Sequence, residues 1–127
     1  MSREFQQEID ELIRARYPLL YVVSWEEERV RQLLAEVAQR QGKLLLEWSI
    51  TDGLRAIVGE LPGAGGRPHR ERNVLAALNE ILQADVSAIY LLKDFHPYLE
   101  APEVVRQVRD LCAALRNSRK SLVILSP

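Results

Sequence analysis

The sequence predicts an α/β fold in which helices cover both faces of a mostly parallel sheet. Short apolar segments rich in β-branched residues alternate with segments whose apolar residues recur at helical spacing. The apolar segments are nearly continuous, which is typical of strands covered on both faces. The length of 127 residues suits one domain with a substantial core. We therefore expect residues 1–127 to form a single three-layer αβα domain.

Composition narrows the function classes. A net charge of −1 gives no overall attraction to nucleic acid or to anionic lipid. Cys112 is the single cysteine, which argues against a disulfide framework or a cysteine-rich metal site. The amino terminus, MSREFQQEID, is charged rather than apolar, and no apolar run approaches the roughly 18 residues of a membrane span. We expect a cytoplasmic protein without nucleic-acid or membrane partners.

The first half of the chain predicts two helices and two strands. Apolar residues at helical spacing indicate a helix over residues 2–15, and Pro18 disfavours its continuation. The apolar run 19–23 then predicts a first strand. A second amphipathic helix is expected over about 25–41, with a second strand over 44–48.

The second half begins with its least regular stretch, residues 50–70. Residues 54–58 fit either a short strand or a tucked loop, and the glycines and prolines that follow predict a mobile loop over about 59–70. The remaining pattern predicts a helix over about 71–83, a third strand over 86–92, a helix over about 102–117 and a fourth strand over 121–125. A chain that ends on a strand suggests a fragment of a longer protein.

The turn after the first strand is the usual phosphate-binding position of such folds, because a helix amino terminus presents free N–H groups. Here the turn holds Ser24 followed by Trp25 and the glutamates 26–28, without GxxxxGK[ST] or GxGxxG. Ser24 and Glu27 have the spacing of a capping box. A helix dipole attracts an anion by about 0.3–1 kcal/mol. One carboxylate about 4 Å away repels it by about 4 kcal/mol at an effective dielectric of about 20. We expect no nucleotide site there.

Asp94 is the most suggestive carboxylate elsewhere. It follows an apolar strand, at the sheet edge where open α/β folds bind ligands. An acid in that position holds Mg²⁺ in NTPases. Phe95 stands where a second acid would activate water, and we favour a role for Asp94 in capping the turn into His96 and Pro97. Asp94 is thus a weak cofactor-binding candidate, and we predict no catalytic or metal-ligating residue.

The other candidate features have structural explanations. The glycines of residues 59–66 lack the lysine and hydroxyl of a phosphate loop, and the basic cluster after them reads as a solvated loop edge. That cluster consists of Arg67, His69, Arg70 and Arg72. Trp48 and Cys112 are expected to be packed, Trp25 is the better contact-surface candidate, and Ser126 ends the fourth strand.

Three segments resemble a known family: ARYPLLYVVSWEEERV, IYLLKDFHPYL and SLVILSP. They are similar to the N-terminal domain of a family of AAA-type ATPases. Its members occur in cyanobacteria and other bacteria and as a hypothetical plastid reading frame in algae. The resemblance covers most of the chain and is weakest in the middle loop.

The resemblance implies a degenerate AAA/P-loop core with residues 19–23 at the Walker A place, 89–94 at the Walker B place and 122–126 at the sensor-1 place. It implies four strands in the order 1-4-3-2, with a fifth strand missing after Pro127. The implied function is non-catalytic: oligomer packing, partner binding or regulation. ATP and magnesium would belong to a downstream AAA module of a homo-oligomeric parent ATPase.

Two other functions stay open from the residues alone. A phospho-acceptor receiver-like switch would use Asp94, although the spacing from the first strand to Asp94 is long for that layout. A stand-alone protein-binding module would use the loop 59–72 as its contact surface. Fold reasoning does not separate such a module from an accessory domain, because function depends on sites.

Overall fold

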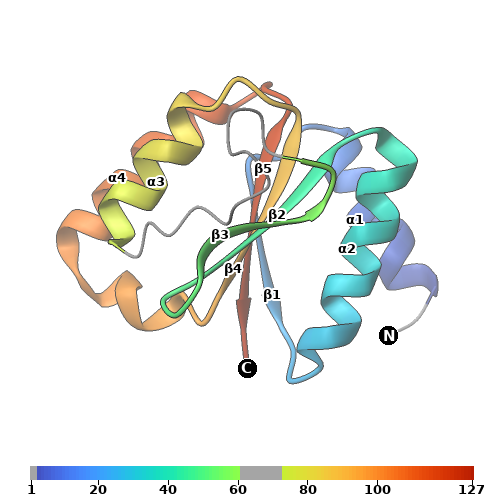
Figure 1. The fold of residues 1–127 in the computed structure, drawn as a ribbon, viewed down its shortest axis with the longest axis horizontal. Coiled ribbons are helices and arrows are strands. Elements are labelled where there is room, and N and C mark those ends of the chain that lie inside the picture. Colours follow the sequence, from blue (N-terminus) through green and yellow to red (C-terminus); the bar gives the residue numbers. More distant parts are fainter. Residues whose placement is uncertain (1–2, 61–72) are drawn as a thin grey trace.

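The computed structural model describes residues 3–60 and 73–127, and within these ranges five strands form one sheet (Figure 1). The elements follow one another as α1 (Arg3–Arg14), β1 (Leu19–Val23), α2 (Glu27–Gln41), β2 (Leu44–Ser49), β3 (Gly53–Val58), α3 (Val74–Gln83), β4 (Ala88–Lys93), the 3-10 helix η1 (His96–Glu100), α4 (Pro102–Leu115) and β5 (Lys120–Ser126). The predicted α/β class is confirmed.

The strand order is β1-β5-β4-β2-β3. The first four strands of this order run parallel, and β3 pairs antiparallel with β2 at the edge. The prediction of four strands in the order 1-4-3-2 is therefore wrong in its count and in its complete order. The four expected strands do lie side by side as β1-β5-β4-β2, and the segment left open between strand and loop is the added strand β3. It forms because Gly53, with φ of 70°, lets the chain turn back directly onto β2.

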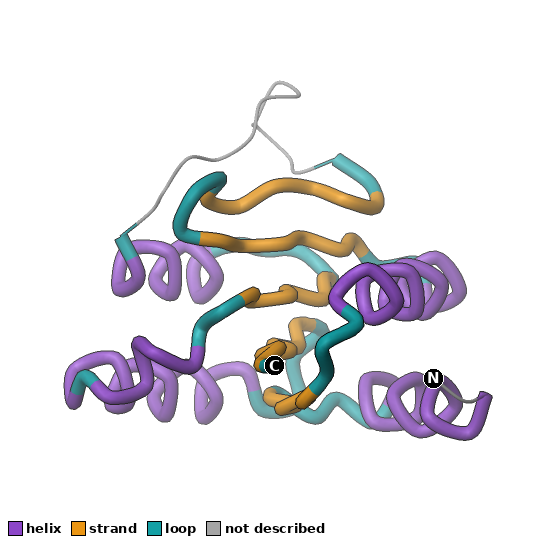
Figure 2. The backbone as a smooth tube through the Cα atoms, turned by 90° about the horizontal axis from the view of Figure 1, so that it is seen from below, coloured by secondary structure: helices purple, strands orange, loops and turns teal. Residues whose placement is uncertain are grey.

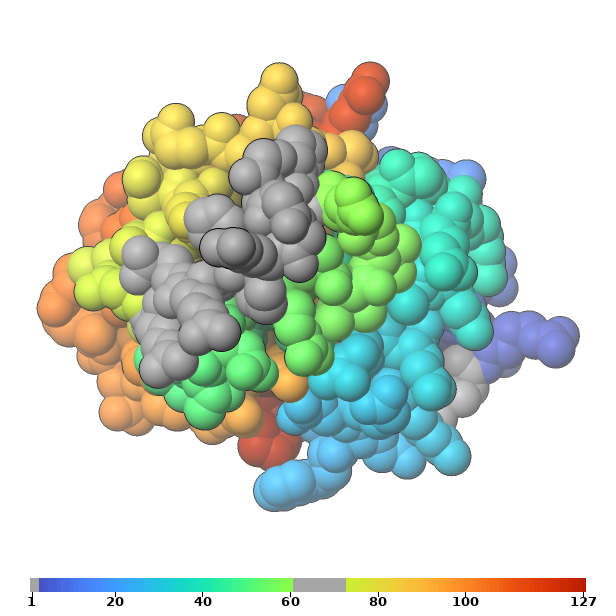
Figure 3. Space-filling model, in the orientation of Figure 1, coloured from blue at the N-terminus to red at the C-terminus, as the bar shows by residue number. Residues whose placement is uncertain are grey.

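Helices cover both faces of the sheet, as Figure 2 shows. On one face α1 and α2 pack against a core that includes Leu45 and Val123. On the other face α3 and α4 pack against a core that includes Tyr90 and Leu122. The two cores use alternate residues of the same strands, as strand geometry requires. In Figure 3 the β2–β3 hairpin, in green, lies between α2 and α3 at the surface.

The predicted capping box is wrong. Helix α2 begins at Glu27 with Glu26 as its N-cap, and no side chain caps it. The Ser24 hydroxyl instead accepts a hydrogen bond of 3.0 Å from the Glu26 N–H, within the turn. The helix starts two residues later than the pattern suggested, so Ser24 is too far from its first turn. Among the described residues, no helix is long and apolar enough to cross a membrane.

Candidate functional site

The four parallel strands end at one edge of the sheet, which we call the C-terminal rim. A crevice of about 200 Å³ opens there, between the ends of β1, β5 and β4. It is lined by Ser24, Trp25, Glu27, Asp94, Leu125 and Pro127. Ligands of open α/β sheets bind at such an edge, where successive crossovers leave on opposite faces. The candidate site of this fold is therefore an acid-lined crevice.

Each glutamate at the start of α2 has a cationic partner. Glu26 lies 3.5 Å from Arg29, and Glu28 lies 2.8 Å from Arg31. Glu27, the one that lines the crevice, lies 2.9 Å from the Nζ atom of Lys93 at the end of β4. Carboxylates in the first turn of a helix also complement its dipole. The protein thus supplies its own anions, and their counterions, at this helix terminus.

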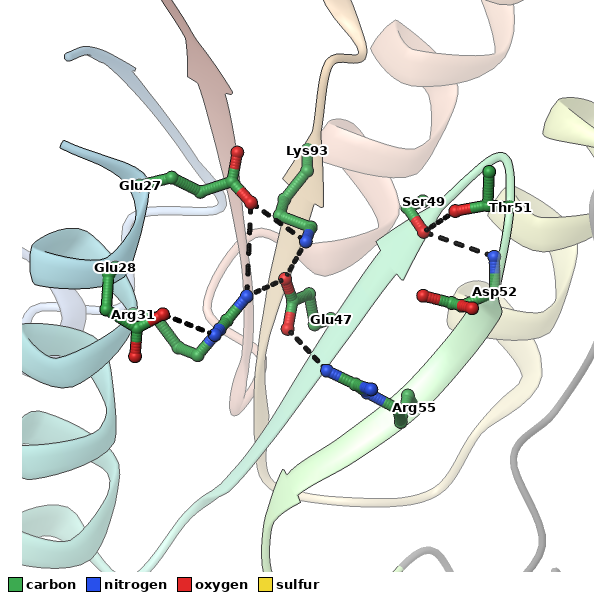
Figure 4. A network of polar contacts seen from close by, with 9 residues as sticks. All are labelled: Glu27, Glu28, Arg31, Glu47, Ser49, Thr51, Asp52, Arg55 and Lys93. Atoms are coloured by element: carbon green, nitrogen blue, oxygen red, sulfur yellow. Dashed lines mark hydrogen bonds and ion pairs between the residues drawn. The ribbon is translucent and has the colours of Figure 1, made fainter. Parts of the chain in front are cut away.

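A buried carboxylate, Glu47 of β2, connects these pairs into one network (Figure 4). Its side chain is 3% exposed, and its Oε1 atom contacts both Lys93 Nζ and the Arg31 guanidinium, the latter at 2.9 Å. Arg55, its antiparallel neighbour on β3, lies 3.7 Å from Oε2. The network of three carboxylates and three cations comprises Glu27, Glu28, Glu47, Arg31, Arg55 and Lys93.

The network keeps all of its members charged. Burial by itself raises the pKa of Glu47, but hydrogen bonds from Arg31 and Lys93, together with their charges, lower that pKa overall. Burial likewise lowers the pKa of Lys93, but its hydrogen bonds to Glu47 and Glu27 raise it overall. The charges cancel, so the network leaves no surplus cation for a phosphate. Beside it, the Ser49 hydroxyl holds the β2–β3 turn through Thr51 and the Asp52 N–H, each at 3.2 Å.

Asp94 lies at the C-terminal rim, as predicted, but it does not cap the following turn. Its φ of 51° is left-handed, a conformation that aspartate tolerates better than most residues. The N-cap of η1 is Phe95, without a side-chain capping bond. Phe95 is buried against Trp48 and Tyr98, with ring centroids 5.9 and 5.8 Å away. Asp94 therefore turns the chain so that the next side chain enters the core.

The structure separates the remaining candidates. Trp25 is 85% exposed at the rim, whereas Trp48 is buried. The Ser126 carbonyl accepts a 2.8 Å hydrogen bond from the Ser24 N–H. Cys112 is half-buried on α4, and burial raises the pKa of its thiol. The cluster of Arg67, His69, Arg70 and Arg72 and most of the predicted mobile loop lie outside the described residues.

No potential metal site of three or more acidic, histidine or cysteine side chains occurs within residues 3–60 and 73–127. The charge network itself was missed by sequence reasoning. The signal that pointed to it was a glutamate in the middle of the otherwise apolar strand LLLEWS. A charged residue is rarely buried unless it is paired, so Glu47 implied partners on neighbouring elements.

Comparison with known proteins identifies the family. Residues 5–127 match the family model for the SpoVK-like AAA ATPase N-terminal domain. The chain belongs to this family. The resemblance seen in its three sequence segments is therefore confirmed for this AAA N-terminal domain.

The relatives of this AAA N-terminal domain include plastid proteins named "uncharacterized AAA domain-containing protein ycf46". The Guillardia theta protein is 32% identical over 125 residues, and the Trieres chinensis protein is 27% identical over 129 residues. The Pyropia yezoensis protein is 26% identical over 125 residues. Each match covers 96% of this chain but 24% of the relative, so the chain spans about a quarter of these proteins. No solved structure shows significant similarity to it.

Proposed function

We propose that this AAA N-terminal domain is a non-catalytic module of a longer AAA-type ATPase and that its own C-terminal rim binds no nucleotide. The observation that carries the proposal is the pairing of Glu27 with Lys93 at the start of α2. In a nucleotide-binding fold of this kind, phosphate oxygens would take the place of that carboxylate.

Binding a phosphate at the rim would require rearranging a buried network. Lys93 is the cation that lies closest to the crevice wall, through Glu27, and it also holds Glu47. If Lys93 turned towards a phosphate, Glu47 would lose one of its two close cationic partners. Removing one partner of a buried ion pair costs about 3–5 kcal/mol, which exceeds the 0.3–1 kcal/mol typical of a helix dipole. The network therefore opposes a nucleotide even where the backbone would favour one.

The proposed role of the domain is oligomer packing, partner binding or regulation. Trp25 supports a contact role, because a tryptophan that is 85% exposed beside a crevice is typical of interface anchors. ATP and magnesium would bind to another module of the full protein, which we expect to be a homo-oligomer. A receiver-like role draws no support from Asp94, since no metal-holding acidic group surrounds it among the described residues.

Calorimetric titration with Mg-ATP and Mg-ADP tests the proposal. The chain is expected to give no binding heat at millimolar nucleotide. Micromolar binding would contradict the proposal and would make Asp94 the first residue to replace.

A matched pair of variants tests the physical reason. Glu27→Gln removes the carboxylate that lines the crevice, whereas Glu28→Gln removes a neighbouring carboxylate that does not line it. We expect Mg-ADP binding to become stronger in Glu27→Gln than in Glu28→Gln. Equal affinities in the two variants would show that the Glu27 carboxylate does not exclude the nucleotide.

A further inference from the structure

Strand β1 leaves one edge of the sheet open. It pairs with β5, and the order β1-β5-β4-β2-β3 places it at the end of the sheet. The Pro18 carbonyl accepts from Leu122 N–H, and Ser24 N–H donates to the Ser126 carbonyl, both at 2.8 Å. Backbone groups of successive strand residues point to opposite sides, so the intervening odd-numbered residues face away from β5.

The odd-numbered residues of β1 are Leu19, Tyr21 and Val23. Their N–H and C=O groups form the open edge. Edges of this kind attract a further strand unless charges, prolines or bulges block them. The sequence LLYVV of β1 contains none of these blocking residues.

The same residues expose an apolar surface. Tyr21 is 51% exposed and Val23 is 70% exposed, although both belong to an apolar strand. They lie on the face that α3 and α4 cover elsewhere, because Leu19 packs against that core. Leu20 and Val22 point the other way and are buried beneath α1 and α2. One face of β1 is therefore covered and the other is not.

The handedness of crossovers indicates what would cover the exposed face. From β1 to β2 the chain crosses the sheet in one direction through α2. From β4 to β5 it crosses in the opposite direction, through α4 on the opposite face. Both arrangements follow from the right-handed rule for parallel strands. A connection from β5 that continues past β1 must then cross on the α4 side, over Tyr21 and Val23.

The positions of the two strand ends allow this connection. Val23 and Ser126 are register partners, so β5 ends beside the end of β1, and Figure 1 shows the C-terminus emerging there. The chain spans about a quarter of its plastid relatives, which leaves ample length for such a segment in a protein of that size. A parallel strand must be reached by a crossover of a dozen or more residues, usually a helix.

We propose that the segment following Pro127 in the longer protein packs a helix over Tyr21 and Val23 and adds a parallel strand to the open edge of β1. This docking surface is separate from the charge network. Its failure would leave the nucleotide proposal untouched, and the reverse also holds.

Backbone amide exchange in the full-length protein tests the docking. The Leu20 and Val22 amides point towards β5 and serve as internal references, whereas the Tyr21 and Val23 amides report on the open edge. We expect exchange at Tyr21 and Val23 to be slowed to within about tenfold of the references, because a docked strand opens together with the sheet. Fast exchange at both positions would overturn the proposal. Protection that disappears on dilution would also overturn it, because a second copy would then be the occupant.

A pair of exposed apolar residues provides matched variants of the full-length protein. Tyr21→Glu places a charge beneath the proposed helix, whereas Leu82→Glu alters an exposed residue on α3. Tyr21→Glu is expected to speed exchange at Val23 and cleavage by protease after Pro127, without affecting Leu20 and Val22. If Tyr21→Glu also loses protection at the references, the milder Tyr21→Ser replaces it. Equal effects of the Tyr21 and Leu82 variants would overturn the proposal.

Discussion

Two lysines are largely buried at opposite ends of the sheet, and they are held in different ways. Lys93, at the C-terminal rim, contacts the carboxylates of Glu27 and Glu47. Lys120, at the start of β5, donates instead to three backbone carbonyls at the end of α3. These are the carbonyls of Ile81 at 2.7 Å, Leu82 at 3.0 Å and Ala84 at 2.7 Å.

The two environments shift the lysine pKa values in opposite directions. Burial lowers the pKa of Lys120, and the charge of Asp85 offsets this only in part. Burial acts in the same sense on Lys93, but Glu47 and Glu27 raise its pKa overall. Lys120 therefore behaves as a cap on the negative end of the α3 dipole. Lys93 neutralises acids that the fold itself has buried. The comparison teaches that the two ends of the sheet use a buried cation for different purposes.

The largest expected effect comes from Lys93→Met, which removes one of the two close cations of Glu47. We expect the free energy of unfolding to fall by about 3 kcal/mol, the lower end of the range for breaking a buried ion pair. The lower end applies because Arg31 still contacts Glu47 at 2.9 Å. Urea unfolding followed by circular dichroism measures the change, and Lys93→Arg is the control that keeps the charge. A loss smaller than that of Lys120→Met would break the comparison.

A smaller effect is expected from Lys120→Met. The three carbonyls lose a charged donor, but a cavity of about 480 Å³ lined by Lys120 and residues 82–87 admits water to them. We therefore expect a loss of about 1–2 kcal/mol, near the value for an unmet hydrogen bond. Amide exchange should show faster opening at the end of α3 and unchanged exchange in α2. A uniform change across the molecule would argue against a local capping role.

The smallest effect is expected in alkaline solution, where the two lysines have opposite signs. The raised pKa of Lys93 means that its stabilisation is complete below 10.5 and is lost as the pH rises through its folded-state pKa. The lowered pKa of Lys120 means that burying its charge costs stability below its folded-state pKa, and this cost disappears as the pH approaches 10.5.

Unfolding measurements between about pH 8 and 11.5 test these signs by comparison with the wild type. The stability deficit of Lys93→Met should shrink above pH 10.5. The deficit of Lys120→Met should grow as the pH rises towards 10.5. Parallel changes in the two variants would show that their lysines do not differ in protonation energetics.

The alternation of apolar patterns was enough to predict the helices and the parallel strands, because each pattern reports locally on burial. Strand β3 stayed ambiguous, since an edge strand of six residues is half exposed and shows only a weak pattern. The capping box failed because its spacing fixes a helix start only when the preceding turn is short. The position of Asp94 at the sheet edge followed from topology, but its left-handed backbone did not.

The charge network lay beyond local patterns. Arg31 and Glu47 are 16 residues apart, and Lys93 joins them from a strand on the other side of α3 in the chain. Such partners become neighbours only once strand order and register are known. The sequence could show that Glu47 needed partners, while the fold alone shows which residues they are.

The two tryptophans have one more consequence, which concerns light emission. Trp48 is enclosed by Phe95 and Tyr98 at centroid distances of 5.9 and 6.0 Å, whereas Trp25 is 85% exposed at the rim. An aqueous quencher such as acrylamide reaches the second indole and not the first. The quenchable, red-shifted part of the fluorescence therefore reports on whatever touches the rim, and the shielded, blue-shifted part reports on the core. The domain thus carries separate built-in probes for association and for unfolding.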